Sequence, residues 1–327
     1  MLRKLNILTL DWPLKQERLF PRVQPLIVEI GFGNGDFLIH LAQTQPNSNI
    51  LGFEISSQAM DKAEAKIEKL GLDNARAIHT RAETALSHLL EPESIREFHI
   101  NYPDPWFKKK HRRRRLISRE TVELLTSRLV RGGRLLLATD ISEYAEMARE
   151  VLSSTIGLDN EYDSAWVTSV TDRFRTKYEL KGYREGRGGH FFSYRRNEQP
   201  VPHPPIIEEL EMPHLFLQSP LSAADITERF QATRRKMGEV HVVILRAYVD
   251  PKRNVAVFEV VVEEPTIEQH TMIMLSPRAE AGEYIVKMTS LGQSRPTYGM
   301  HRAVQAVGEW VAGLDGEGMV LERKLRR

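Results

Sequence analysis

The chain of 327 residues is 41% hydrophobic and 28% charged with a net charge of +2, which is typical of a globular protein, and its length predicts two domains. No stretch approaches the roughly 18 consecutive apolar residues of a membrane helix, and the first residues lack the pattern of a signal peptide, so we expect a cytoplasmic protein without a membrane segment. The absence of cysteine excludes disulfides, thiolate metal sites and cysteine nucleophiles, and the histidines show no metal-ligand spacing, so we expect no metal site.

The first 195 residues alternate short apolar runs with stretches of helical spacing, which predicts an α/β domain with an open, mostly parallel sheet covered on both faces. The apolar runs predict strands at residues 26–30, 50–55, 75–79, 97–101 and 134–139. The helical spacing predicts helices at residues 36–43, 57–70, 118–130 and 141–152, with Gly132-Gly133 ending the third. We assign this domain to residues 1–197.

A second, smaller α+β domain with an antiparallel sheet is predicted at residues 221–327, after a proline-rich linker at 198–220. It opens with Ser222 and Asp225, which form a capping-box pattern in front of a helix. Apolar runs predict strands at residues 240–249, 255–263, 272–275 and 284–288, with 250–254 as a hairpin loop and a closing helix at 301–312.

A glycine-rich loop, Glu29-Ile30-Gly31-Phe32-Gly33-Asn34-Gly35, follows the first strand and allows a ligand to approach the backbone closely. A dinucleotide fingerprint needs a glycine where Asp36 stands, and an acid at a helix N-terminus disfavours a pyrophosphate. Glu29 and Asp36 instead favour a ligand with a cationic amino-acid end, such as S-adenosylmethionine. Glu54, which closes the second strand, is placed to accept both ribose hydroxyls. From the loop alone, a dinucleotide fold or a purely structural turn stays an alternative.

A second motif, Asn101-Tyr102-Pro103-Asp104-Pro105-Trp106-Phe107, follows the fourth strand and leads into the basic run 108–115. The excess of Lys and Arg over Asp and Glu lies in the first 204 residues, and much of it is in this run. Two prolines hold Asp104 on a stiff loop, and Trp106 offers a face on which a base can stack. A basic run alone also fits a solvated face or a sorting signal, but beside this motif it favours RNA. The predicted RNA contacts are Trp106, Lys109, Lys110, Arg112, Arg113, Arg114 and Arg115.

These motifs resemble the signature of the tRNA (guanine-N7-)-methyltransferases, the TrmB family, and the chain is identified as a member with an additional C-terminal domain. The resemblance covers roughly residues 25–195 and extends through the glycine loop, Glu54, Thr139-Asp140 and residues 176–179. It implies a class I S-adenosylmethionine-dependent methyltransferase fold with a Rossmann-like doubly wound sheet. It also implies methyl transfer from S-adenosylmethionine to guanine N7 in the variable loop of tRNA, at tRNA position 46, so tRNA is the expected partner.

The resemblance further implies roles for particular residues. Asp104 is the catalytic candidate. The implied cofactor contacts are Glu29, Gly31, Gly33, Gly35, Glu54, Arg81, Ala82 and Asp104. The implied substrate contacts are Lys108, Asp140, Thr176, Lys177, Tyr178 and Glu179. Arg81 departs from the family, which usually has Asp or Asn there against adenine, so adenine recognition would pass to the backbone at Ala82 or to Glu83.

The chemistry is consistent with a carboxylate at position 104. Guanine N7 keeps a free lone pair at neutral pH, so the transfer needs positioning and no general base. Positive charge develops on the guanine imidazole ring, and an anion at Asp104 would stabilise it. Asp140 would accept hydrogen bonds from guanine N1 and N2, or else would only cap the helix predicted to begin at residue 141.

Several functions stay open from the residues alone: the tRNA enzyme, a methyltransferase acting on another RNA or on protein, and a non-catalytic RNA-binding protein that kept the fold. The polar stretch 172–187 by itself predicts an exposed loop. The second domain offers Arg246, Tyr248, Arg295 and Tyr298 as RNA contacts. Its slightly acidic balance instead favours dimerisation of the chain, as a homodimer, or packing against the first domain.

Overall fold

The computed structural model describes residues 5–107, 115–171, 173–289 and 293–326. The chain divides into two compact units, residues 1–207 and 208–327, and the division lies within the proline-rich stretch. Separate hydrophobic clusters form the cores of the two units.

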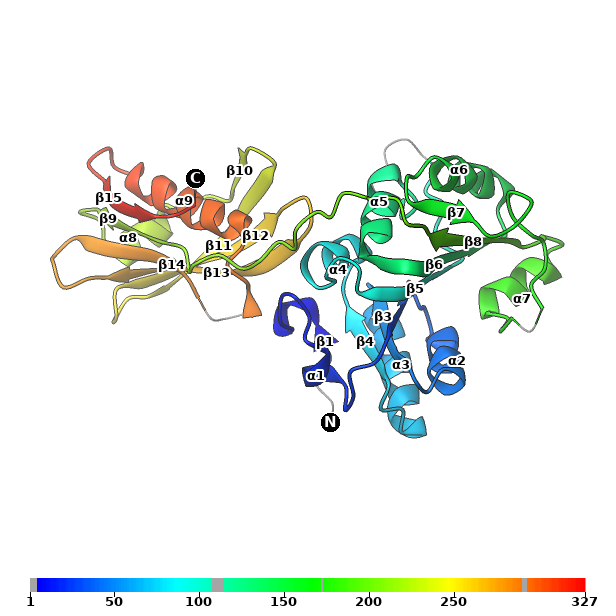
Figure 1. Cartoon of the computed structure of the whole chain (residues 1–327). Coiled ribbons are helices and arrows are strands. Elements are labelled where there is room, and N and C mark those ends of the chain that lie inside the picture. Colours follow the sequence, from blue (N-terminus) through cyan, green and yellow to red (C-terminus); the bar gives the residue numbers. More distant parts are fainter. Residues whose placement is uncertain (1–4, 108–114, 172, 290–292, 327) are drawn as a thin grey trace. The chain divides into compact units, whose positions relative to one another are not determined.

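An eight-stranded sheet forms the centre of the first unit, in the order β1-β4-β3-β2-β5-β6-β8-β7 (Figure 1). Its strands are β1 (Leu5–Asn6), β2 (Leu26–Ile30), β3 (Asn49–Glu54), β4 (Ala75–His79), β5 (Ile95–Asn101), β6 (Leu129–Thr139), β7 (Leu158–Asn160) and β8 (His190–Arg196). The neighbours from β1 to β6 in this order pair in parallel, whereas β8 runs antiparallel to both β6 and β7. Successive strands are added in opposite directions on the two sides of β2 and β5, which makes this place the topological switch point where open α/β sheets bind ligands.

Helices cover both faces of this sheet (Figure 1). The helices of this unit are η1 (Ile7–Thr9), α1 (Gln16–Leu19), α2 (Asp36–Thr44), α3 (Ser57–Leu70), α4 (Ala82–His88), α5 (Arg119–Arg128), α6 (Ser142–Ser153) and α7 (Lys177–Arg184). Ile27 of β2 packs in the cluster formed with α2 and α3, whereas Val28 packs in the cluster formed with α4, α5 and α6. A strand buried along its whole length is expected between two helical layers. The predicted Rossmann-like doubly wound sheet is therefore confirmed.

Most predicted elements agree with the observed ones to within a few residues, and α3 shows why. Ser56 accepts a hydrogen bond from the backbone N–H of Ala59 at its start, and Gly71 ends it in the left-handed conformation. The prediction that Gly132-Gly133 end a helix is wrong. Helix α5 ends at Arg128 and β6 begins at once, because the glycines lie in an irregular part of β6 where its register with β5 shifts.

The second unit contains a seven-stranded antiparallel sheet in the order β10-β11-β12-β13-β14-β9-β15 (Figure 1). Its strands are β9 (His214–Gln218), β10 (Thr233–Met237), β11 (Val240–Asp250), β12 (Val255–Glu263), β13 (Glu268–Pro277), β14 (Glu283–Met288) and β15 (Met319–Lys324). Helices α8 (Ala223–Glu228) and α9 (Tyr298–Ala312) contribute to its core. The predicted capping box of Ser222 and Asp225 is present at the start of α8. No helix of the described residues is long and apolar enough to cross a membrane.

Three strands of this unit were not predicted. The linker predicted at 198–220 is too long, because β9 lies inside it and buries Leu215 and Leu217 completely. Strand β15 follows α9 and pairs with β9, with Lys324 opposite His214. Strand β10 is an edge strand whose middle residues are exposed.

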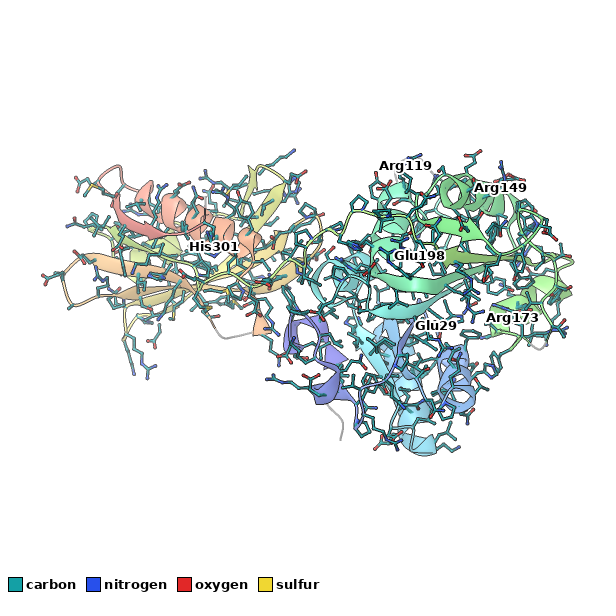
Figure 2. The ribbon with its side chains drawn as sticks, viewed as in Figure 1. Glu29, Arg119, Arg149, Arg173, Glu198 and His301 are labelled. Atoms are coloured by element: carbon teal, nitrogen blue, oxygen red, sulfur yellow. The ribbon has the colours of Figure 1, made fainter. Side chains whose placement is uncertain are left out.

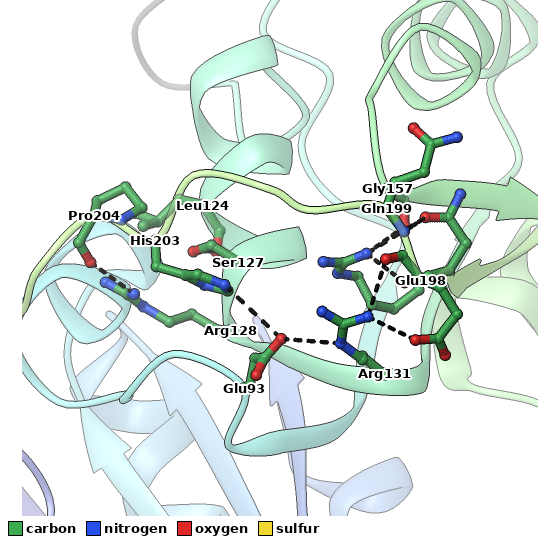
Figure 3. A network of polar contacts seen from close by, with 12 residues as sticks. Glu93, Leu124, Ser127, Arg128, Arg131, Gly157, Glu198, Gln199, His203 and Pro204 are labelled. Atoms are coloured by element: carbon green, nitrogen blue, oxygen red, sulfur yellow. Dashed lines mark hydrogen bonds and ion pairs between the residues drawn. The ribbon is translucent and has the colours of Figure 1, made fainter.

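The proline-rich stretch that belongs to the first unit lies along α5 and is held by arginines (Figure 3). Arg128, which is completely buried, donates hydrogen bonds to the carbonyl oxygens of Pro204 (2.9 Å) and Leu86 (3.0 Å). Arg131 pairs with the carboxylate of Glu198 (2.6 Å). These contacts make residues 198–207 part of the first unit's structure.

Candidate active site

The glycine loop lies at the switch point, between β2 and α2. Gly31, Gly33 and Gly35 all have positive φ (+73°, +55° and +79°), which favours glycine over other residues. A Cβ on Gly31 would meet no atom of the residues that the structure describes within 4 Å, so this part of the loop is open to a ligand. A Cβ on Gly35 would lie 2.8 Å from the Cβ of Ala63, so Gly35 serves the packing of α2 against α3.

Glu29 is buried at the carboxyl end of β2, with 2% of its surface exposed. Its Oε1 accepts a long hydrogen bond from Nδ2 of Asn101 (3.3 Å), whereas its Oε2 is buried and has no hydrogen-bond partner among the described residues. Burial raises the pKa of Glu29 to about 8 against the opposing effects of the Asn101 hydrogen bond and Arg173, and Glu54 and Asp36 raise it further. A buried carboxyl group with one oxygen left unpaired among the described residues fits the ammonium group of an amino-acid ligand.

Glu54 ends β3 beside the glycine loop. Its Oε2 accepts a hydrogen bond from the backbone N–H of Gly33 (3.0 Å), and its Oε1 accepts from those of Ile55 (2.8 Å) and Ser56 (3.0 Å). These three bonds fix the carboxylate, and its remaining lone pairs can accept from two ribose hydroxyls.

Asp36 begins α2, as predicted, but its charge is paired with Lys66, which also donates to the carbonyl oxygen of Asn34 (2.7 Å). The pairing weakens the electrostatic argument that Asp36 repels a pyrophosphate. Glu29 is therefore the main evidence for a cationic ligand.

Arg81 and Ala82 lie next to the end of β3. Arg81 is exposed and precedes the first residue of α4, and Ala82 is buried. The backbone N–H of Thr80 donates to the carbonyl oxygen of Glu54 (3.0 Å). This bond joins the segment to the end of β3, where Glu54 is the candidate ribose contact. The arrangement suits an adenine contact from the backbone here.

Asp104 is exposed on the loop that follows β5. Trp106 is half-buried and has a φ of +42°, a strained value for a residue other than glycine. Arg115 braces this loop by donating to the carbonyl oxygens of Trp106 and Phe107 (2.9 Å each). The structure thus gives Arg115 a bracing contact within the protein. The other basic residues predicted to contact RNA or substrate lie outside the described residues. They are Lys108, Lys109, Lys110, Arg112, Arg113 and Arg114.

Asp140 follows β6 and is brought against α7. Its carboxylate pairs with Arg187 (2.7 Å), and a Cβ on Gly182 would lie 2.8 Å from its Oδ2. Asp140 does not cap α6: the cap position is Ile141, whose N–H donates to the hydroxyl of Thr139 (3.3 Å).

The stretch around Thr176 is not the exposed loop that its polarity predicts. It forms the start of α7, where the buried hydroxyl of Thr176 accepts a hydrogen bond from the N–H of Glu179 (3.2 Å). Glu179 is also buried, whereas Lys177 is exposed. Tyr178 lies in α7, and its side chain is outside the described set.

Sequence reasoning assigned no role to Arg173 or Asn101, although both connect predicted residues. Arg173 pairs with Glu179 and donates to Oδ1 of Asn101 (2.5 Å), which in turn donates to Glu29. Figure 2 labels Glu29 and Arg173 among the side chains of the first unit. Arg173 and Asn101 also line a cavity of about 210 Å³ together with aromatic side chains that include Phe37 and Phe191. Their only sequence signals are their places: Asn101 opens the proline motif, and Arg173 stands three residues before Thr176.

The chain is similar to known methyltransferases. A family model described as "Putative methyltransferase" matches residues 23–191. The chain is 32% identical over 299 residues to the tRNA (guanine-N(7)-)-methyltransferase of Thermus thermophilus, an alignment that covers 90% of this chain and 92% of the relative. It is 36% identical over 188 residues to the enzyme of the same name from Alkalilimnicola ehrlichii, covering 58% of this chain and 79% of the relative.

Solved structures resemble about half of the chain. One is an rRNA methylase from Streptococcus thermophilus, with 19% identity, a TM-score of 0.38, and coverage of 54% of this chain and 88% of that one. Another is the aminoglycoside resistance methyltransferase NpmB1, with 16% identity, a TM-score of 0.37, and coverage of 55% and 91%.

Proposed function

The chain belongs to the tRNA (guanine-N(7)-)-methyltransferase family, and from this premise we propose that it transfers a methyl group from S-adenosylmethionine to N7 of a guanine in tRNA. The observation that carries the proposal within the structure is Glu29, a buried carboxyl group beside an open glycine loop at the switch point, one of whose oxygens has no partner in the described part of the chain. We propose further that the guanine is the one in the variable loop, at tRNA position 46.

The cofactor, when bound, supplies a methyl group made electrophilic by its sulfonium centre. Glu29 holds the ammonium end, and Gly31, Gly33 and Gly35 let the backbone approach the ligand. Glu54, already oriented by three backbone N–H groups, accepts the ribose hydroxyls. The backbone at Arg81 and Ala82 borders the adenine. Asp104 completes this set of cofactor contacts.

Asp104 is the proposed catalytic residue. It acts electrostatically, because guanine N7 presents a free lone pair and needs no proton removed. The prolines on either side stiffen its loop, and Arg115 braces the following residues. An exposed carboxylate held beside the cofactor end of β5 stabilises the positive charge that develops on the guanine ring.

Asp140 and the start of α7 are the proposed substrate contacts, because Asp140 packs against the helix that carries Thr176, Lys177, Tyr178 and Glu179. Lys108 belongs to the same proposal, and so do the RNA contacts from Trp106, Lys109, Lys110 and the arginines from 112 to 115. tRNA is the proposed macromolecular partner, and the cytoplasm is the proposed location. A homodimer is the assembly we propose for the full chain.

The direct test uses labelled S-adenosylmethionine and an unmodified tRNA transcript, followed by chain scission specific for N7-methylguanine. We expect one scission site, in the variable loop, which disappears when that guanine is replaced by adenine. Transfer to the replaced transcript would reject the proposed position. Transfer to rRNA but not to tRNA would reject the proposed substrate, and failure to bind or use the cofactor would reject the activity.

Replacing Asp104 by asparagine should lower kcat by roughly 100-fold or more, because an oriented charge in the transition state is lost while the shape is kept. Asp104→Ala should abolish turnover. The matched control is Asp163→Asn, another exposed aspartate of the first unit, which should leave kcat unchanged. Single-turnover methyl transfer to tRNA measures the effect, and normal turnover in Asp104→Asn would rule out the electrostatic role.

A further inference from the structure

Arg173 joins two parts of the active site that are far apart in the sequence. One terminal nitrogen donates to Glu179 at the first turn of α7, and the other donates to the side-chain carbonyl of Asn101 at the end of β5. The amide of Asn101 then donates to Glu29 at the end of β2. Glu29, Asn101, Arg173 and Glu179 thus form one continuous chain of hydrogen bonds from the proposed cofactor site to the proposed substrate segment.

The guanidinium of Arg173 is itself held in place. Its side chain is 14% exposed, and its charge lies 4.8 Å from the ring centre of Phe191 and 5.9 Å from that of Phe37. Glu179 is fixed in turn, because its backbone N–H donates to the hydroxyl of Thr176. A planar group with donors in a fixed fork can orient two acceptors at once, which a flexible ammonium cannot do.

Asn101 gains a defined orientation from this arrangement. Because Arg173 occupies its carbonyl oxygen, the amide nitrogen must point toward Glu29. The bond to Glu29 is long, so the amide guides the carboxylate without satisfying it, and Oε2 stays available. The charged groups around Glu29 are Arg173 before α7, Glu54 at the end of β3 and Asp36 at the start of α2.

We propose that Arg173 is a positioning residue that orients Glu29 through Asn101 for the ammonium group of the cofactor and, with the same guanidinium, fixes Glu179 for tRNA. The inference rests on the proposed function for its ligands. It predicts that loss of Arg173 weakens cofactor binding and tRNA binding together, although the side chain touches neither the methyl group nor the guanine.

The test measures binding of three probes to the full chain by calorimetry. S-adenosylhomocysteine carries an ammonium and a carboxylate, decarboxylated S-adenosylhomocysteine carries the ammonium alone, and methylthioadenosine carries neither. Arg173→Gln should weaken the two ammonium-bearing probes about 10-fold and leave methylthioadenosine within about twofold. Asn101→Ala should give the same pattern. The double variant should be no weaker than the stronger single effect, because both residues act along one path.

Arg175→Gln is the matched control, because Arg175 is an exposed arginine two residues away whose guanidinium lies over Tyr183. It should bind all three probes like the unchanged protein. Arg173→Lys should recover only part of the loss, since an ammonium reaches one acceptor at a time. In steady state, Arg173→Gln should also raise the KM for tRNA, with a smaller change in kcat at saturation.

Four outcomes would overturn the proposal. Unchanged affinity in Arg173→Gln would show that Glu29 needs no such support. Loss confined to S-adenosylhomocysteine would mean that Arg173 binds the ligand's carboxylate directly. Loss that extends to methylthioadenosine would indicate general damage. Strictly additive effects of Arg173→Gln and Asn101→Ala would exclude a common path. Failure of the unchanged protein to bind any probe would instead reject the proposed function.

Discussion

Among single residues, Glu29 has the strongest electrostatic consequence. With its pKa raised to about 8 mainly by burial, the carboxyl of the ligand-free protein holds its proton at neutral pH. An ammonium ligand favours the ionised form, so binding and proton release are linked.

We therefore expect close to one proton to be released for each S-adenosylhomocysteine bound at pH 7. Calorimetry in buffers with different ionisation enthalpies measures this number directly. Glu29→Gln cannot release the proton and should bind with none released and with lower affinity. A buffer-independent enthalpy in the unchanged protein would contradict the raised pKa.

The same residue predicts how stability depends on pH in the ligand-free state. Because the folded pKa of about 8 lies above the ordinary value of 4.5, the folded state binds the proton more tightly than the unfolded state. The contribution of Glu29 protonation to the free energy of unfolding is complete below about pH 4.5. It is lost as the pH rises through 8, and the loss is a few kcal/mol at most. Glu29→Gln should lack this loss, so denaturant unfolding at pH 5 and pH 9 should show a smaller difference in the variant.

Sequence reasoning reached Glu29, Glu54 and Asp104 because each has a local signal: an acid before glycines, an acid at a strand end, an acid between prolines. It did not reach Asn101 or Arg173. Their partnership spans 72 positions in the chain, and no local pattern separates Arg173 from other arginines in a polar stretch.

Among the elements, α7 is stabilised at its N-terminus by a side-chain cap. Thr176 satisfies the N–H of Glu179, and Ser118 makes the equivalent bond to Thr121 at the start of α5. Thr176→Ala and Ser118→Ala should each destabilise their helix by about 1 kcal/mol.

Only Thr176→Ala should raise the KM for tRNA, by roughly fivefold if that free energy opposes binding. Thr176→Ser, which keeps the hydroxyl, should restore it. Steady-state kinetics with tRNA, together with hydrogen exchange of residues 177–184, provides the readout. Equal KM changes in Thr176→Ala and Ser118→Ala would show that α7 has no special role in tRNA binding.

Strand β2 and helix α3 were predicted within a residue or two because each has a clear sequence pattern. Burial on both faces gives β2 a continuous apolar run, and burial of one face gives α3 a helical period. β9 was not, because Pro213 and Pro220 surround its short alternation of buried leucines. β10 was not, because Arg234, Arg235 and Lys236 make it polar, and backbone pairing with β11 alone makes it a strand. The glycine pair Gly132-Gly133 is typical of a helix end, but it lies within β6, where the pairing with β5 is irregular. The sequence pattern does not show this pairing.

For the whole molecule, the extent of the first unit can be tested by truncation. A chain ending at residue 207 keeps the carbonyl of Pro204 that accepts from buried Arg128, whereas a chain ending at residue 197, the predicted domain boundary, loses it. Leaving this buried donor without a partner should cost about 1–3 kcal/mol.

We expect the 207-residue form to fold and to bind S-adenosylhomocysteine, and the 197-residue form to melt at a lower temperature. Arg128→Leu made in both forms should narrow the difference between their melting temperatures, because the buried donor is then absent from both. Equal melting temperatures of the two truncated forms would show that residues 198–207 add nothing to the first unit.

The pairing of β9 with β15 places the first and last strands of the second unit side by side, with His214 opposite Lys324. When the first and last strands of a domain are adjacent, its two ends lie close together. Such a domain can be inserted into a surface loop of another protein with short connections at both ends. It can also be circularly permuted. Linking residue 324 to residue 214 by a short turn and opening the chain in the hairpin at 250–254 would leave every other strand pair in its present order. The second unit therefore has the geometry of a domain that tolerates insertion into other proteins and circular permutation.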